Sequence, residues 1–261
     1  MTKPDLVDVA SRRDERNIPI DKVGVKDLRY PIRLLDRAKG EQHTVGTFNM
    51  YVNLPQEFKG THMSRFVEAL NECGGEISVD GLRDILQGIR QRLHAESAHL
   101  EVEFPYFVEK EAPVSRARGL MEYGCRFVGS ITNGDYDVQI FVRVPVSTLC
   151  PCSKEISDSG AHNQRGIITI GFRFERMVWI EEIIALAEES SSSAVYSMLK
   201  REDEKYVTEL AYANPVFVED VVRNVAQRLD AHRNITWYSV EVENFESIHN
   251  HNAYASLIKK K

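Results

Sequence analysis

The order of the hydrophobic patterns along the chain restricts its fold more than any other feature of the sequence. Two helices are predicted in the first half, one over residues 62–71 and one that begins with Ser78 or Asp80 as its N-cap and has apolar residues at helical spacing. Apolar and polar residues alternate, as in strands with one buried face, on both sides of these helices, at 28–34, 44–52, 100–108 and 123–131. This order predicts an α+β module with an antiparallel sheet.

The same order returns after Asn133-Gly134, a dipeptide typical of tight turns. Helices are predicted at 180–187, at 195–201 and from Pro215, with Asn214 as the cap of the last one. Strands are predicted at 136–144, 168–174, 236–242 and 249–258. We therefore predict two tandem ββααββ modules, over residues 26–132 and 133–261, preceded by a polar N-terminal arm over residues 1–25.

Composition excludes several classes of protein. The hydrophobic content of 43% can fill a real core, and the net charge of −6 argues against a general nucleic-acid binder. No apolar run approaches the length of a membrane span, and the N-terminus lacks the hydrophobic region of a signal peptide. The four cysteines are too few and too scattered for a secreted disulfide scaffold. We expect a cytoplasmic protein with reduced thiols, and with neither a nucleic acid nor a membrane as its partner.

A segment rich in cysteine and turn-forming residues interrupts the second module, between the strands predicted at 136–144 and 168–174. Pro151 separates Cys150 from Cys152, and a residue that precedes proline favours the extended conformation. In an extended chain, residues two apart face the same side, so both sulfurs are expected to face one cavity. His162 follows a run of small residues that lets the chain turn back towards the thiols. The segment predicts a metal site at the edge of a sheet.

Packing remains an alternative for each of these cysteines, because free cysteine is often a buried hydrophobic residue. Cys125 lies within a predicted strand and is expected to be structural. Cys-x-Cys is not a standard zinc spacing, and Cys150, Cys152 and His162 are fewer than the four local ligands of a structural zinc module. The missing ligands have to come from distant sequence, which is the pattern of a catalytic metal with an open position for water.

Three other stretches are unusually polar. Residues 200–209 are typical of a solvated charged face. Glu219 lies in the first turn of a predicted helix, where the helix dipole favours a carboxylate and capping alone explains it. The group Glu243, Glu246, His249 and His251 is denser than surface decoration requires, and it favours a functional role.

Four segments of the chain together resemble the type IB GTP cyclohydrolases: FKGTHMSRF (58–66), PVSTLCPCSKEISDSGAHNQRG (145–166), NPVFVED (214–220) and NFESIHNHNAYA (244–255). The resemblance extends over essentially the whole chain. It implies the tunnelling fold, in which ββααββ modules join into barrels by oligomerisation, and a homotetramer. It also implies that GTP and water are converted into 7,8-dihydroneopterin triphosphate and formate, the first step of tetrahydrofolate biosynthesis.

The resemblance assigns roles to individual residues. The metal ligands of the family match Cys150, His162 and Glu204, which gives the 200–209 stretch a second interpretation. This mixed set of soft and hard donors suits zinc, manganese or iron(II). Glu219 matches the carboxylate that anchors guanine. A carboxylate accepts hydrogen bonds from guanine N1–H and from its 2-amino group together, a donor pair that adenine lacks.

The same resemblance implies attack on C8 of guanine by a water molecule that the metal activates. His249 and His251, with Glu246, are the candidates for moving protons at the ring nitrogens. Cys152 is expected beside the metal as a supporting or catalytic thiol, with packing as the alternative. The basic residues expected to hold the triphosphate, for which plain solvation is the alternative, are Lys59, His62, Arg65, Lys154 and Arg165.

Two other functions compete with this one. A nitrile reductase of the same fold acts on a deazaguanine through a covalent cysteine thioimide and NADPH, and it needs no metal, so a chelator distinguishes it from a cyclohydrolase. A non-catalytic binding module that uses Cys150 and His162 only for structure unfolds when its metal is removed.

Overall fold

The structure is a computed structural model that describes residues 8–10 and 12–261. The chain divides into two compact units, and each is assembled from two separate stretches. Unit 1 consists of Met1–Phe104 and Arg126–Gln139, and unit 2 of Pro105–Cys125 and Ile140–Lys261. Three strands contribute residues to both units: β3 (Ser97–Glu111), β4 (Arg118–Thr132) and β5 (Asp135–Leu149).

The strands form one large sheet in the order β1-β2-β3-β4-β5-β6-β8-β9, with the short β7 paired to β5. Each strand pair with a defined register, such as β1 with β2 and β5 with β6, is antiparallel. The predicted α+β class with an antiparallel sheet is therefore confirmed. Asn133 and Gly134 both have positive φ, 54° and 94°, as a tight turn between β4 and β5 requires.

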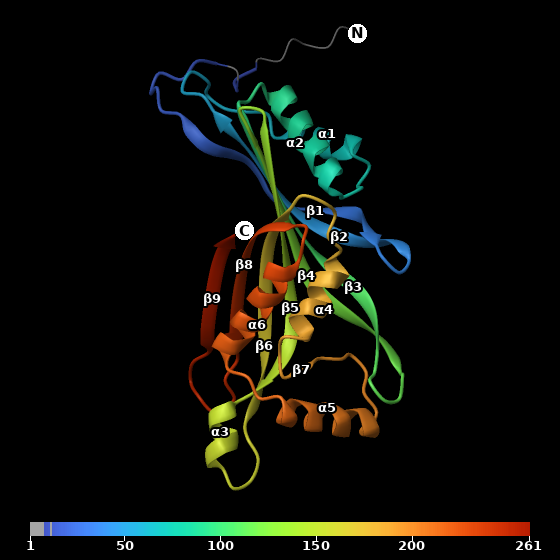
Figure 1. Cartoon of the computed structure of the whole chain (residues 1–261). Coiled ribbons are helices and arrows are strands. Elements are labelled where there is room, and N and C mark those ends of the chain that lie inside the picture. Colours follow the sequence, from blue (N-terminus) through green and yellow to red (C-terminus); the bar gives the residue numbers. More distant parts are fainter. Residues whose placement is uncertain (1–7, 11) are drawn as a thin grey trace. The chain divides into compact units, whose positions relative to one another are not determined.

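Unit 1 is built on a long hairpin of β1 (Ile20–Asp36) and β2 (Gly40–Leu54), with the helices α1 (Ser64–Glu72) and α2 (Val79–Leu93) packed together (Figure 1). Ser78 caps α2, because its hydroxyl accepts a hydrogen bond from the Gly81 amide at 3.1 Å. The predicted apolar stripe of α2 is buried at Leu82, Ile85, Leu86 and Ile89.

Strand β1 begins at Ile20, within the stretch that the sequence assigns to the N-terminal arm. The register with β2 shifts between Val25 and Leu28, and this bulge breaks the alternation of side chains that reveals a strand in a sequence. The part of the predicted arm at residues 1–7 and 11 lies outside the described residues.

Unit 2 is a sheet with helices on it. Figure 1 shows α4 (Ile180–Glu188) beside α6 (Val218–Ala231), and α6 contacts both β8 (Ile235–Asn244) and β9 (Ala253–Lys260). The other elements of this unit are α3 (Pro151–Ile156), β6 (Asn163–Phe174), β7 (Ser193–Ala194) and α5 (Arg201–Ala213). The core between sheet and helices includes the fully buried side chains of Val142, Ile170, Ile183, Val221, Val225 and Val240.

Three predicted boundaries in unit 2 are wrong. Residues 195–200 form no helix, and α5 begins only at Arg201, where the Asp203 carboxylate accepts a hydrogen bond from the Lys200 amide at 2.8 Å. Pro215 does not open a helix, because the Val216 amide donates to the Leu149 carbonyl at 3.1 Å and α6 starts at Val218. Residues 249–252 are loop, and β9 starts at Ala253.

Candidate metal centre

Three strand ends meet at one edge of unit 2. Leu149, the last residue of β5, is paired with Asn163, the first residue of β6. Further along β6, Gly166 is paired with Asn244, the last residue of β8. Residues that immediately follow β5, precede β6 or follow β8 are therefore neighbours, although the sequence separates them widely.

Cys150 and His162 lie side by side at this edge, as the sequence predicts. The Cys150 amide donates a hydrogen bond to the His162 carbonyl at 3.1 Å. Ser153 joins the same two residues, because its hydroxyl accepts from the His162 amide at 3.2 Å and donates to the Cys150 carbonyl at 3.3 Å. The main chains of a cysteine and a histidine are thus held side by side by one direct hydrogen bond and by the Ser153 hydroxyl.

The segment before Cys150 is anchored from two directions. The Leu149 amide donates to the Ser192 hydroxyl at 3.0 Å, and the Leu149 carbonyl accepts from the Val216 amide at 3.1 Å. Ser192 is buried within the serine tract that follows α4. The position of Cys150 is therefore fixed by the segments before β7 and before α6, as well as by its own strand.

The expectation that Cys150 and Cys152 lie in one extended segment is wrong. Pro151 is the first residue of α3, and Cys150 is the N-cap, with its sulfur accepting a hydrogen bond from the Ser153 amide at 3.4 Å. Proline suits the first helical position, because its φ is already helical and its missing amide hydrogen has no helical acceptor there. Cys152 consequently lies on an exposed helix, whereas Cys150 is half-buried.

The Nδ1 atom of the His162 imidazole faces two side-chain oxygens. Its Nδ1 lies 2.9 Å from the Gln164 Oε1 and 3.9 Å from the Glu246 Oε2, and the His162 and Glu246 side chains are only 14% and 12% exposed. Glu246 comes from the loop after β8, and its predicted role in proton transfer stays a prediction. The Gln164 amide nitrogen in turn donates to the Thr148 hydroxyl at 3.0 Å.

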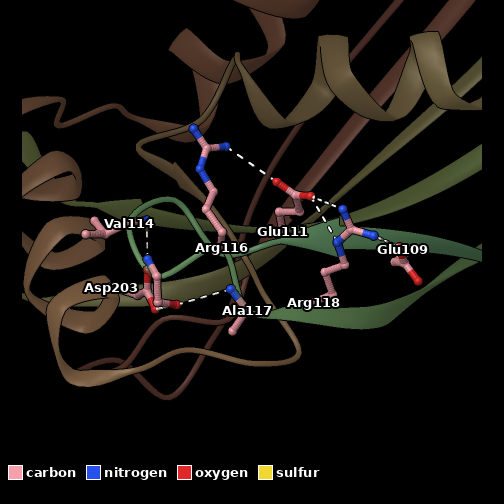
Figure 2. Close-up of polar contacts among 8 residues, drawn as sticks. Glu109, Glu111, Val114, Arg116, Ala117, Arg118 and Asp203 are labelled. Atoms are coloured by element: carbon pink, nitrogen blue, oxygen red, sulfur yellow. Dashed lines mark hydrogen bonds and ion pairs between the residues drawn. The ribbon is translucent and has the colours of Figure 1, made fainter.

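Glu204 lies in the first turn of α5, next to a carboxylate that fixes this end of the helix. The Asp203 side chain accepts hydrogen bonds from the Val114 amide at 2.8 Å and from the Ser115 amide at 2.9 Å, in the turn between β3 and β4. Figure 2 shows Asp203 pointing into this turn. Burial raises the pKa of Asp203, but the hydrogen bonds from Ser115, Lys200 and Val114 outweigh it and lower that pKa below its ordinary value.

The opposite end of α5 contacts the cysteine segment. The Lys154 ammonium donates to the Tyr212 carbonyl at 2.5 Å and lies 4.4 Å from the centre of the Tyr212 ring. Tyr212 follows Glu204 by eight residues (212 − 204 = 8), over which an α-helix rises about 12 Å. Within the described residues, no group of three or more His, Cys, Asp or Glu side chains is placed to hold a metal ion.

The donor chemistry of the site nevertheless fits a divalent metal at two positions. Cys150 supplies a thiol and His162 an imidazole, the two ligand types that zinc prefers and that other transition metals accept. Glu204 does not join this pair in the described part of the chain. Its role as third ligand stays a prediction.

Glu219 lies exposed in the first turn of α6 and lines a groove of about 470 Å³ between α6 and β9. Arg223, Gln227 and Asp230 continue the groove along α6, and residues 255–257 of β9 form its other wall. Because the Val216 amide is hydrogen-bonded to the carbonyl at the end of β5, the start of α6 and the cysteine segment belong to the same region of unit 2.

The remaining predicted residues of unit 2 are exposed. The His249 and His251 rings stack on each other with their centres 5.1 Å apart, in the loop between β8 and β9. Arg165 is exposed on β6, where its carbonyl accepts from the Phe245 amide at 2.9 Å. The two histidine rings therefore lie together on the protein surface, and their role in proton transfer stays a prediction.

The other three residues expected at the triphosphate belong to unit 1. His62 lies 3.1 Å from the Asp8 carboxylate through its Nε2, and the Arg65 guanidinium donates to the Arg92 carbonyl at 2.6 Å. The Lys59 amide donates to the Arg12 carbonyl at 2.9 Å, and its side chain is exposed. Their role in triphosphate binding also stays a prediction.

Three residues that shape this region were not singled out by the sequence. Ser153, Gln164 and Ser192 position Cys150 and His162 through the hydrogen bonds described above. A signal existed for Gln164, since it lies two residues after His162 at the start of a strand and so faces the same side. No such signal marks Ser192, whose contact depends on how β7 returns to β5.

Comparison with known proteins identifies the family of the chain. The family model described as type I GTP cyclohydrolase folE2 matches residues 6–255. The chain belongs to this family. Two relatives named GTP cyclohydrolase FolE2 are 58% identical over 257 residues, from Syntrophobacter fumaroxidans, and 59% identical over 255 residues, from Syntrophus aciditrophicus. In both comparisons 98% of this chain aligns with 100% of the relative.

Solved structures of lower similarity support the fold of this FolE2 family member. Uricase from Arthrobacter globiformis superimposes with a TM-score of 0.55 at 7% identity, covering 92% of this chain and 93% of that chain. Urate oxidase from Bacillus subtilis gives a TM-score of 0.52 at 8% identity, with coverage of 92% and 98%. Among the described residues, no helix is long and apolar enough to cross a membrane.

Proposed function

We propose that this chain is a metal-dependent GTP cyclohydrolase that converts GTP and water into 7,8-dihydroneopterin triphosphate and formate, at the start of folate biosynthesis. Its membership of the FolE2 family supports the reaction. The observation that supports the chemistry is the pair of Cys150 and His162, which backbone hydrogen bonds hold together at one edge of unit 2.

The metal we propose is manganese, zinc or iron(II), held by Cys150, His162 and Glu204. A divalent ion supplies, when bound, a Lewis acid that lowers the pKa of a water molecule. The protein holds the first two ligands by backbone hydrogen bonds, and it holds the end of α5 that carries Glu204 through the buried Asp203. The half-buried setting of Cys150 and His162 limits competition from bulk water.

The remaining residues bind the substrate and move protons. Glu219, exposed at the groove beside α6, accepts hydrogen bonds from guanine N1–H and the 2-amino group. Glu246 lies 3.9 Å from the His162 Nδ1, in the loop that also carries His249 and His251, and we assign proton transfer to these three residues. Cys152 stands exposed next to this region, where it is available to substrate.

We also propose that the chain assembles as a homotetramer in the cytoplasm, with tandem ββααββ modules joined into barrels. Cys73, Cys125, Cys150 and Cys152 are all free thiols, which is compatible with a reducing compartment. The exposed apolar side chains of β9, Tyr254, Leu257 and Ile258, lie on an outer strand of the sheet and are suited to burial against another subunit.

The reaction is tested with the purified protein reconstituted with manganese and supplied with GTP. We expect formate, together with a pterin that becomes fluorescent on oxidation, and we expect both to disappear with a chelator and in C150A. A folded, metal-loaded sample that releases no formate refutes the cyclohydrolase assignment. Formate release that survives chelation refutes the metal dependence, and chelation that unfolds the protein favours a structural metal.

The assignment of Glu204 needs a separate experiment, because Glu204 lies at the end of α5 opposite to the end that contacts α3. E204Q is expected to weaken metal binding as measured by equilibrium dialysis. Mixing C150A with E204Q after dissociation and reassembly then shows how the site is composed. Activity regained in the mixture means that one subunit supplies the thiol and another the carboxylate, whereas no gain means that one chain supplies both.

A further inference from the structure

Gln164 is a polar residue in a buried position, and glutamine is mostly exposed in proteins. It is the second residue of β6, it is buried at 8% exposure, and its partner across the ladder is Thr148 on β5, which is fully buried. Buried amides need partners for both their oxygen and their nitrogen. Here the two partners are Thr148 and the imidazole of His162.

The amide orientation determines which nitrogen of His162 carries a proton. The Gln164 Nε2 donates to the Thr148 hydroxyl at 3.0 Å, which leaves Oε1 at 2.9 Å from the His162 Nδ1. An amide oxygen only accepts hydrogen bonds, so the proton of a neutral His162 lies on Nδ1. The lone pair of the ring is then on Nε2.

Glu246 supports the same assignment independently. Its Oε2 lies 3.9 Å from the same Nδ1, and a carboxylate on that side favours a proton there. The reverse orientation of the amide would direct its NH₂ group at Nδ1 and transfer the ring proton to Nε2. In that arrangement Nδ1 would no longer face the Gln164 oxygen as its acceptor, and a protonated Nε2 could not bind a metal.

We propose that Gln164 is a positioning residue that fixes the Nδ1–H tautomer of His162 and so presents Nε2 as a metal ligand. The inference rests on the proposed metal site at Cys150 and His162. A ligating histidine commonly donates its other ring N–H to an oxygen acceptor, which orients the ring and raises its basicity. Thr148 contacts the Gln164 amide from the opposite side, where its hydroxyl accepts from Nε2.

The test measures metal affinity, which does not depend on turnover. The full-length protein is stripped of metal and titrated with Co²⁺, and the thiolate-to-cobalt absorption band reports binding through Cys150. Q164L removes the acceptor, Q164E keeps an acceptor that cannot donate, and T148V frees the Gln164 amide to rotate. T169V removes a hydroxyl from β6, the strand that carries Gln164, and serves as the matched control.

We expect Q164L to weaken Co²⁺ binding by roughly 10- to 100-fold, the usual effect of removing such a partner of a ligand. Q164E should stay within about threefold of wild type, because a carboxylate is an even better acceptor for Nδ1–H. T148V should lie between these two, and T169V should match wild type. Circular dichroism confirms that each variant is folded, and T148V with Q164E carries the test if Q164L does not fold.

Two failures are distinguishable. If H162A loses Co²⁺ but Q164L and T148V bind it as tightly as wild type, the tautomer inference is overturned and the metal site stands. If H162A binds Co²⁺ as tightly as wild type, the metal site of the proposed function is itself wrong, and the inference about Gln164 falls with it. Strong binding by Q164L combined with a loss in Q164E would also overturn the inference.

Discussion

The ion pair of Lys110 and Glu188 gives the sharpest prediction for the stability of unit 2. The Lys110 ammonium lies 2.6 Å from the Glu188 carboxylate, and the two side chains are only 15% and 14% exposed. The Tyr123 hydroxyl donates to the same carboxylate oxygen at 2.8 Å, and Lys110 also donates to the Val195 carbonyl at 2.9 Å. Desolvation lowers the pKa of Lys110, and Glu188 offsets part of that effect.

Replacing Lys110 with methionine keeps the apolar stem but leaves the Glu188 charge without its cation. Breaking a buried ion pair by removing one partner costs about 3–5 kcal/mol of stability. Because both side chains are still partly exposed, we expect K110M to cost about 3 kcal/mol, the low end of this range. Adding E188Q removes the uncompensated charge while keeping an oxygen for Tyr123. We expect the double variant to recover to within about 1 kcal/mol of wild type.

The assay is urea unfolding of wild type, K110M, E188Q and K110M/E188Q, all at the same protein concentration. A double variant less stable than K110M would refute the reasoning, since it would mean that the unpaired charge is not the source of the loss. K110M within about 0.5 kcal/mol of wild type would show that water reaches the pair and screens it. K110M is also expected to loosen the segment after β7, which shows as faster proteolysis near Val195.

Three further outcomes are expected. E219Q should raise the KM for GTP by roughly 10- to 100-fold in the formate assay, because a charged hydrogen-bond acceptor is worth about 1.5–3 kcal/mol, and an unchanged KM would remove Glu219 from the guanine site. Burial raises the pKa of Tyr136 to about 12, so its contribution to stability is complete below pH 10 and is lost as pH rises towards 12. The difference in unfolding free energy between wild type and Y136F should therefore change between pH 9 and pH 11.5, and a constant difference would contradict the raised pKa. G166A places a methyl group 2.5 Å from the Asn244 Oδ1 and 3.2 Å from the Glu243 carbonyl. Urea unfolding should show that the free energy of unfolding falls by about 1–3 kcal/mol, and an unchanged value would contradict this steric argument.

Much of the fold is readable from the sequence because its signals are local. Alternation of apolar residues predicts β3, β4, β5, β6 and β8, and the stripe with Ser78 as cap predicts α2. The errors lie where a distant partner decides the local conformation. The segment at Pro215 is held by the end of β5, and α5 starts where Asp203 meets the turn between β3 and β4.

The candidate site divides in the same way. The composition of the cysteine segment determined which residue types could bind a metal, and the return from β5 to β6 made Cys150 and His162 neighbours as predicted. The helical start at Pro151 was not foreseen, because proline is compatible both with an extended residue before it and with the first turn of a helix.

The sequence by itself determined the α+β class, the antiparallel pairing and the donor types of the site, because periodicity and residue chemistry are properties of short segments. Only the tertiary structure decided that Gln164 and Glu246 both face the Nδ1 of His162, and that Ser192 and Val216 hold the residue before Cys150. These contacts join strands, loops and helices far apart in the chain. Their geometry depends on the pairing of whole strands, which no local pattern encodes.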